Sequence, residues 1–177
     1  AAPSLAVDGK RVFAIFASGD LACYDLEGNF VWGKNVGVPD NTYGHGSSLI
    51  TDGQRLFVQY DQDKGSRFMT YDNATGKEVW RVDERKHPSW ATPSLIQTRF
   101  VAQLFVNSEK DVDADDPGTG KLLWTSECLG GEVAPSPAYN GNGILFVANE
   151  YAEATALKLT ANGAEIMWHY DEYLPDI

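Results

Sequence analysis

The sequence is poor in basic residues, and this shortage excludes one function class at once. Fourteen Lys and Arg stand against 25 Asp and Glu in 177 residues, which gives a net charge of −11. A protein that binds nucleic acid without regard to its sequence needs a basic surface. The acidic balance therefore excludes nucleic acid as a partner of that kind and disfavours adhesion to anionic lipid.

Long apolar runs and cysteine clusters are also missing. No segment approaches the roughly 20 apolar residues that cross a bilayer as a helix, so we expect no transmembrane segment. Cys23 and Cys128 lie 105 positions apart and form neither a disulfide framework nor a metal-binding cluster. The chain begins at Ala1 without the initiator Met, charged segment and apolar segment of a signal peptide. We therefore expect a processed or excised piece of a longer protein.

What the sequence does contain is an internal repeat marked by four tryptophans. Trp32, Trp80, Trp124 and Trp168 are spaced 48, 44 and 44 residues apart. Each tryptophan ends a phrase that contains a glycine, and the clearest copies are DNATGKEVW at 72–80 and DPGTGKLLW at 116–124. Such a period indicates a repeat architecture, in which each repeat is one unit of secondary structure.

A second phrase recurs in phase with the first and divides each repeat into strands. This phrase consists of a small residue or Pro, then Ser, and usually an apolar residue. It recurs at 2–5, 46–49, 92–95 and 134–137. A turn and a short apolar run follow it. Each repeat therefore predicts four short strands, and no window has a helical period. Four-stranded units of about 40–45 residues are typical of β-propeller blades.

We therefore predict an all-β fold, a β-propeller of four-stranded antiparallel blades in a single domain. Hydrophobic residues make up 43% of the chain, which is enough to bury the core of one such domain. The domain is predicted to cover residues 1–177, with blades at about 1–36, 45–86, 90–130 and 133–170.

The repeated side chains have predicted structural roles. The tryptophans are expected at equivalent, mostly buried positions between neighbouring blades. The Asp and Gly of each phrase are expected to form a turn, because Asp accepts backbone N–H groups two residues on and Gly adopts positive φ. The predicted structural residues are Trp32, Trp80, Trp124, Trp168, Asp25, Asp72, Asp116, Gly28, Gly76 and Gly120.

The phrase Asp-x-x-Thr-Gly-Lys-x-x-Trp, found at 72–80 and 116–124, resembles the repeat of quinoprotein-type β-propellers, the pyrroloquinoline-quinone (PQQ)-like repeat family. The resemblance covers nearly the whole chain, and segments 43–49 and 87–93 are similar to those of large secreted or periplasmic bacterial members. Members usually have about seven or eight blades. The resemblance thus implies that the four repeats form an arc of a larger propeller, in a periplasmic or secreted bacterial protein.

The family has two functional branches. One consists of dehydrogenases that hold the quinone over Ca²⁺, against a disulfide between two adjacent cysteines. The other has no cofactor and resembles the outer-membrane assembly lipoprotein and other scaffold propellers, which bind proteins or ligands. Cys23 and Cys128 are not adjacent, so the resemblance implies a non-enzymatic binding or scaffold propeller with no cofactor. The alternative is a fragment of a PQQ-dependent dehydrogenase whose cofactor site lies on missing blades.

The acidic run 111–116 does not predict a calcium loop. The sixth and twelfth positions of such a loop need Gly and Glu, and here they hold Asp116 and Leu122. On a strand, Asp111, Asp113 and Asp115 would share one face. We expect that face to be solvated, and we assign no metal ligand or catalytic residue in the chain.

The candidate binding residues lie in the loops that precede the first strands of two repeats. His45 and His87 hold similar places there, beside Tyr43 and Trp90, and these four are predicted to contribute to a loop face. The expected partner is a protein or the remaining blades of the parent chain. A second alternative is a propeller that binds carbohydrate or another polymer through exposed aromatic residues such as Trp90, Tyr151 and Tyr173.

Overall fold

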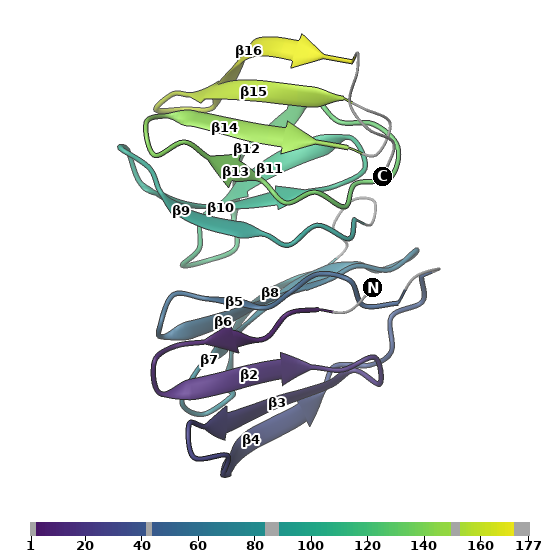
Figure 1. Ribbon diagram of the computed structural model, residues 1–177, viewed down its shortest axis with the longest axis vertical. Coiled ribbons are helices and arrows are strands. Elements are labelled where there is room, and N and C mark those ends of the chain that lie inside the picture. Colours follow the sequence, from purple (N-terminus) through teal and green to yellow (C-terminus); the bar gives the residue numbers. More distant parts are fainter. Residues whose placement is uncertain (1–2, 42–43, 84–88, 150–152, 172–177) are drawn as a thin grey trace. The chain divides into compact units, whose positions relative to one another are not determined.

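The computed structural model describes residues 3–41, 44–83, 89–149 and 153–171 and shows an all-β protein (Figure 1). These residues form sixteen strands and no helix. The strands make four antiparallel sheets of four, each a meander whose strands follow one another in sequence. This confirms the prediction of an all-β fold built from four-stranded antiparallel blades. No helix in the described part of the chain could span a membrane.

The chain divides into two compact units, Ala1–Arg85 and Lys86–Ile177, each with two sheets. In the first unit, sheet one is β1 (Ala6–Val7), β2 (Arg11–Ile15), β3 (Asp20–Asp25) and β4 (Phe30–Asn35). Sheet two is β5 (Ile50–Thr51), β6 (Arg55–Tyr60), β7 (Arg67–Asp72) and β8 (Glu78–Val82).

In the second unit, sheet three is β9 (Ser94–Gln97), β10 (Ala102–Asn107), β11 (Asp111–Asp115) and β12 (Leu122–Glu127). Sheet four is β13 (Ala138–Tyr139), β14 (Ile144–Ala148), β15 (Ala154–Leu159) and β16 (Ala164–Tyr170). The extent of a single domain over residues 1–177 stays a prediction.

All four sheets share one register, which sets the tryptophans at equivalent positions. Each tryptophan of the fourth strand pairs with a residue of the third strand, and the register shifts directly after that residue. The pairs are Cys23 with Trp32, Thr70 with Trp80, Ala114 with Trp124 and Ala156 with Trp168. A register shift of this kind marks a β-bulge, so each sheet bends at the same pair.

A phenylalanine completes the same cross-strand row in each sheet. Phe13, Phe57, Phe105 and Phe146 of the second strands pair with the residues that face the tryptophans. The ring centroids of each Phe and Trp lie 5.8–6.2 Å apart, a separation typical of favourable aromatic pairs. We call this arrangement of a phenylalanine, a third-strand residue and a tryptophan the Phe–Trp row.

The tryptophans differ in burial, contrary to the expectation that they would be mostly buried. Trp32 is 8% exposed, Trp80 and Trp124 are half-buried, and Trp168 is 46% exposed. Sheet two packs over Trp32, because both belong to one core cluster. β16, in contrast, is the last strand that the structure describes, so no later described strand covers Trp168.

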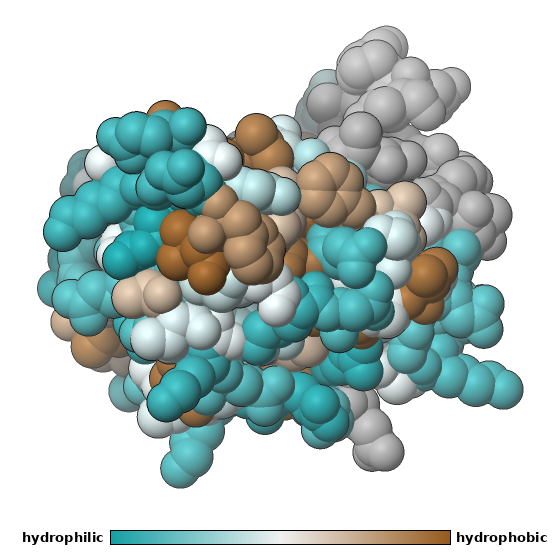
Figure 2. All heavy atoms as spheres, turned by 90° about the horizontal axis from the view of Figure 1, so that it is seen from below, coloured by the Kyte–Doolittle hydropathy of each residue, from teal (hydrophilic) through white to brown (hydrophobic). Residues whose placement is uncertain are grey.

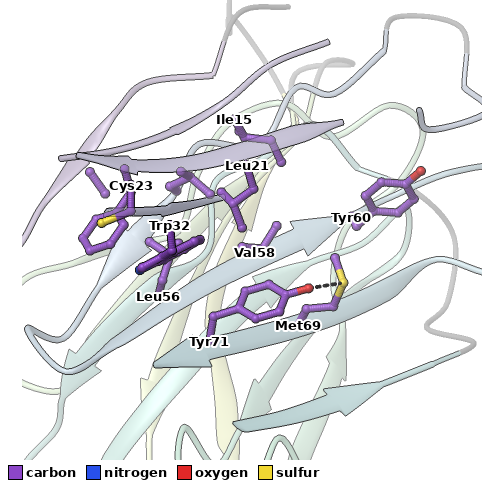
Figure 3. Close-up of a cluster of buried hydrophobic side chains, with 12 residues drawn as sticks. Ile15, Leu21, Cys23, Trp32, Leu56, Val58, Tyr60, Met69 and Tyr71 are labelled. Atoms are coloured by element: carbon purple, nitrogen blue, oxygen red, sulfur yellow. Dashed lines mark hydrogen bonds between the residues drawn. The ribbon is translucent and has the colours of Figure 1, made fainter. Parts of the chain in front are cut away.

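The core of the first unit lies between its two sheets (Figure 3). Side chains such as Ile15, Leu21 and Trp32 from sheet one meet Leu56 and Val58 from sheet two in a single layer. In the second unit, the corresponding core joins β10 and β11 to β14 and β15. Burying each such side chain contributes about 1.5–3 kcal/mol, so each pair of sheets forms a packed core.

Two of the three aspartates expected on a solvated face are buried, so that prediction is wrong. Asp113 and Asp115 of β11 are both buried. Val112 and Ala114, which alternate with them, belong to the core of the second unit, so β11 is buried on both faces. Alternation along the strand identified side chains on a common face, but did not show whether that face meets water.

Candidate functional site

The connections between strands gather at two ends of each sheet (Figure 1). Because neighbouring strands are antiparallel, the link from the first to the second strand and the link from the third to the fourth lie at one end. We call this the turn end. The link from the second to the third strand and the link to the next sheet lie at the other end, which we call the loop end.

At the turn end, an acidic side chain closes each of five connections by accepting backbone N–H groups of its own turn, at 2.6–3.1 Å. These acids are Asp8, Asp25, Asp52, Asp72 and Asp116. The glycines in three of the turns, Gly28, Gly76 and Gly120, have positive φ angles of 87°, 66° and 71°. The repeated Asp and Gly thus shape the turns.

In two of these turns, hydrogen bonds lower the pKa of the carboxylate. A hydrogen bond from the side chain of Asn29 is the largest cause that lowers the pKa of Asp25. The Thr75 side chain is the largest cause that lowers the pKa of Asp72. Oxygens engaged in this way are poorly placed for proton transfer, so these acids are turn-forming residues rather than candidate catalysts.

A hollow of about 300 Å³ lies at the turn end of the first unit, between sheets one and two. Its lining consists of Asp8, Lys10, Arg11, Gly53, Gln54, Asp72, Asn73 and Ala74. At its base, Arg11 Nη1 donates to Asp8 Oδ2 at 2.9 Å. Burial is the largest single influence on the pKa of Asp8 and raises it. The backbone N–H groups of Lys10 and Arg11 and the Arg11 guanidinium lower this pKa, and together they outweigh burial, so the net shift is downward.

Asn73 connects this hollow to the Phe–Trp row. Its backbone oxygen accepts the indole N–H of Trp32 at 2.9 Å. Its side-chain Nδ2 donates to Asp8 Oδ2 at 3.0 Å and to Thr51 Oγ1 at 2.9 Å. Asn73 Oδ1 is buried and has no hydrogen-bond partner among the described residues. The residue therefore ties sheet one to sheet two and leaves one acceptor buried at the hollow.

We expect Asn73→Ala to lower the free energy of unfolding of the first unit by about 1–3 kcal/mol, because buried partners such as Asp8 lose a hydrogen bond. Urea unfolding followed by circular dichroism measures the change. Asn162→Ala is the matched control, since Asn162 lies exposed in the corresponding turn of sheet four. Its expected effect is below about 0.5 kcal/mol. Equal losses in the two variants would contradict the connecting role of Asn73.

At the loop end, the structure describes two of the four predicted binding residues. His45 is buried, with its ring centroid 6.2 Å from that of Tyr60. Burial lowers the pKa of His45 to about 4, so the imidazole is neutral at pH 7. Its Nε2 has no hydrogen-bond partner among the described residues. Sequence reasoning placed this ring on a loop face because a histidine between two glycines gives no signal of burial.

The other predicted aromatic residue belongs to the second unit. Trp90 is half-buried, and its backbone N–H donates to the Val133 oxygen at 2.9 Å. Tyr43 and His87 lie outside the described residues, as do Tyr151 and Tyr173. The loop-face role of these residues stays a prediction.

The residues of this chain do not fit a quinone site of the dehydrogenase type. Such a site needs two adjacent cysteines, whereas Cys23 and Cys128 are both free, both buried and in different units. Burial raises the pKa of each thiol to about 11, so neither is a reactive thiolate. Within the described ranges, no three His, Cys, Asp or Glu side chains gather as a metal site.

Exposed apolar residues recur on the outermost strand of each sheet, and we call this set of positions the apolar rim. The residue directly before each tryptophan is apolar and 41–50% exposed, and these residues are Val31, Val79, Leu123 and Met167. Phe30, Leu122 and Ile166 extend the rim and are more exposed. Figure 2, seen from the side where β4 lies in Figure 1, shows apolar residues gathered on a mostly hydrophilic face. The apolar residue before every tryptophan was a visible signal that sequence reasoning missed.

The shared register, the Phe–Trp rows and the Asp–Gly turns define the class of the protein as a β-propeller built from PQQ-like repeats. Residues 1–106 and 108–172 match the family described as outer membrane protein assembly factor BamB. The chain belongs to this family, which confirms the resemblance found in the repeat.

Solved structures share the fold at low sequence identity. BamB from Moraxella catarrhalis has a TM-score of 0.70 at 17% identity, over 93% of this chain and 50% of that one. Quinohemoprotein alcohol dehydrogenase from Comamonas testosteroni has a TM-score of 0.72 at 13% identity, over 98% and 35%. A europium-containing methanol dehydrogenase has a TM-score of 0.68 at 12% identity, over 92% and 40%.

The chain therefore spans half or less of the length of these three proteins. An assembly factor and two dehydrogenases share the fold, so the fold alone does not separate the two branches. No curated protein matches the sequence.

Proposed function

We propose that this chain is part of a non-enzymatic binding or scaffold propeller that contacts proteins through its apolar rim and loop faces. The family supports this proposal, since its description is that of an outer membrane protein assembly factor. Membership of this family also favours a location of the protein in the bacterial periplasm or at the outer membrane. The single observation that carries the proposal is the apolar rim.

The rim has the features of a protein-binding surface. Its side chains sit at the same position in all four sheets, on a chain whose net charge is −11. Covering each Val, Leu or Met side chain with a partner contributes about 1.5–3 kcal/mol at most. Among the described residues, each outermost strand has one edge that pairs with no other strand, and an extended segment of a partner can add backbone hydrogen bonds there.

The hollow at the turn end offers a polar contact beside this apolar one. Lys10 and Gln54 are exposed at its edge, while the carboxylates of Asp8 and Asp72 are held by their own turns. At the loop end, Trp90, Tyr43 and His87 remain the proposed contacts. His45 is buried and acts on this face only by supporting the loop.

Two substitutions on one strand test the rim. Leu123→Lys places a charge at a rim position, and Thr125→Lys places the same charge two residues further along β12. We expect Leu123→Lys to reduce the amount of partner cross-linked from a bacterial envelope extract by about tenfold, as for loss of one good apolar contact. Thr125→Lys should retain wild-type cross-linking. Equal cross-linking by the two variants would contradict the role of the rim.

A second assay tests whether this chain holds a quinone site of its own. The chain is titrated with PQQ in the presence of Ca²⁺ by calorimetry, and reduction of a redox dye is followed with a series of alcohols. We expect no saturable binding and no dye reduction. Tight binding together with dye reduction would overturn the proposal in favour of a dehydrogenase fragment.

A further inference from the structure

All three Asn–Gly dipeptides of the sequence lie in turns of sheet four. Asn140–Gly141 and Asn142–Gly143 lie between β13 and β14, and Asn162–Gly163 lies between β15 and β16. Asparagine before glycine is prone to spontaneous deamidation, because glycine has no side chain that hinders attack by its own backbone nitrogen. The sequence makes the three dipeptides alike, so their surroundings in the fold must distinguish them.

Deamidation balances with water as its only co-reactant. The backbone nitrogen of the glycine loses its proton and attacks the asparagine Cγ. The bond from Cγ to the side-chain nitrogen then breaks, ammonia leaves, and a succinimide ring remains. Water opens the ring at one of its two carbonyls, which gives aspartate or isoaspartate. A hydrogen bond that holds either the glycine N–H or the asparagine amide must break first, so it slows the reaction.

The turn between β13 and β14 holds one reacting group at each of its two sites. Asn140 Oδ1 accepts the backbone N–H groups of Asn142 and Ile144 at 2.8 and 3.0 Å. The Asn140 amide therefore cannot turn towards the next residue without breaking both bonds. At the second site, the Gly143 nitrogen that would attack Asn142 donates its N–H to the Tyr139 hydroxyl at 2.8 Å.

The turn between β15 and β16 lacks the aspartate that holds the equivalent nitrogen in sheets two and three. Asp72 Oδ1 accepts the N–H of Thr75 at 2.8 Å, and Asp116 Oδ1 accepts that of Thr119 at 3.0 Å. Thr160 occupies this position in sheet four, because the tryptophan follows eight residues later in all three phrases. The carboxylate acceptor is therefore missing from this turn.

Both reacting groups of Asn162–Gly163 are consequently free to meet. The Thr160 hydroxyl donates to the Gly163 oxygen at 3.1 Å and does not hold the Gly163 nitrogen. Among the described residues, no group accepts the Gly163 N–H or bonds to the Asn162 side chain. No atom lies within 4 Å of a Cβ placed on Gly163, so the space around the dipeptide is open.

A sheet that follows this turn does not cover its tip. Asn162 is exposed at the tip in sheet four. Glu27 and Gly118 lie at the tips of the corresponding turns of sheets one and three, and both are exposed. Each of these two sheets is followed by another sheet within its own unit. The accessibility of Asn162 is therefore a property of the turn itself.

We propose that Asn162 is a site of spontaneous deamidation in the folded protein, and that the fold protects Asn140 and Asn142. Each event adds a negative charge at the turn end of sheet four. Isoaspartate also lengthens the backbone of a turn that Thr160 closes by donating its N–H and its hydroxyl to the Gly163 oxygen. The inference is independent of the proposed partner on the rim.

Peptide mapping by mass spectrometry, over days in mildly alkaline buffer, measures deamidation at each asparagine in one sample. In the folded chain we expect Asn162 to react at least about fivefold faster than Asn140 or Asn142, the effect of one hydrogen bond on a rate. An isoaspartate methyltransferase labels the isoaspartate formed at position 162. In denaturant the three sites should react at similar rates, because the protection belongs to the fold.

Two variants should move the rates in opposite directions. Thr160→Asp restores the missing carboxylate, so deamidation at Asn162 should slow about fivefold. Tyr139→Phe keeps the ring and removes the hydroxyl that accepts the Gly143 N–H, so deamidation at Asn142 should accelerate by a similar factor. In each variant the site that is not altered serves as the internal control, and circular dichroism checks the fold.

Three results would overturn the proposal. Equal rates at the three asparagines in the folded chain would show that the turns do not control the reaction. A preference for Asn162 that persists at the same ratio in denaturant would assign it to the sequence and not to the fold. Unchanged rates in both variants would show that the named hydrogen bonds do not protect the nitrogen.

Discussion

Trp32→Ala lowers the free energy of unfolding of the first unit by about 3–5 kcal/mol, which is the usual cost of removing a buried tryptophan. The side chain is nearly buried, packs against Phe13 with the two rings tilted, and donates a hydrogen bond to the Asn73 oxygen. Its loss leaves a cavity between sheets one and two. Because the chain has two units, hydrogen exchange at amides of β2, β3, β6 and β7 is the measurement that reports on this unit.

Two variants serve as controls for this prediction. Trp168→Ala removes the equivalent side chain where it is exposed, and we expect a loss below about 1 kcal/mol in dilute protein. Trp32→Phe keeps a ring beside Phe13 but removes the indole donor, so we expect an intermediate loss of about 1–2 kcal/mol. Similar losses of unfolding free energy for Trp32→Ala and Trp168→Ala would show that the packing of sheet two over Trp32 does not stabilise the first unit.

The first unit also loses up to about 3 kcal/mol of stability between pH 6.5 and pH 4, through His45. Burial lowers the pKa of His45 from 6.5 to about 4 in the folded chain. Between these values the unfolded chain binds a proton that the folded chain does not, so stability falls as the pH falls. The magnitude follows from about 1.4 kcal/mol for each pKa unit.

His45→Phe tests this dependence, since it keeps a ring beside Tyr60 and cannot titrate. We expect the variant to show a flatter stability profile in urea unfolding from pH 7 to pH 4. The turn acids act in a separate window, because the pKa values of Asp8, Asp25, Asp52 and Asp72 are lowered from 3.8. Their contribution is lost only as the pH falls below that value. An unchanged slope between pH 6.5 and pH 4 in His45→Phe would contradict the assignment.

The repeated phrases predicted the blades because turn chemistry and strand periodicity are local. Asp72 and Gly76 act within six residues of chain, so their spacing in the sequence is enough to reveal the hairpin. The family could be inferred for the same reason. The phrase at 72–80 determines both the turn and the position of Trp80.

What sequence reasoning missed depends on contacts between elements far apart in the chain. The burial of Asp113 and Asp115 depends on what packs over that face of β11, which alternation does not reveal. The exposure of Trp168 depends on whether another sheet covers its row. The role of Asn73 arises from Trp32, 41 residues earlier, and a short turn phrase carries no sign of that bond.

The meander order of the sheets has a consequence for how the chain folds. Every strand pairing in the described part of the chain joins neighbours in sequence, so each sheet forms by closing short loops, at little entropic cost. Topologies of low contact order fold quickly, and repeats that contact mainly their neighbours can nucleate in more than one place. During synthesis, a sheet can therefore assemble as soon as its fourth strand leaves the ribosome, before the sheet that will cover its tryptophan exists. Until then that Phe–Trp row is exposed to solvent, and the order of translation determines how long each row remains exposed.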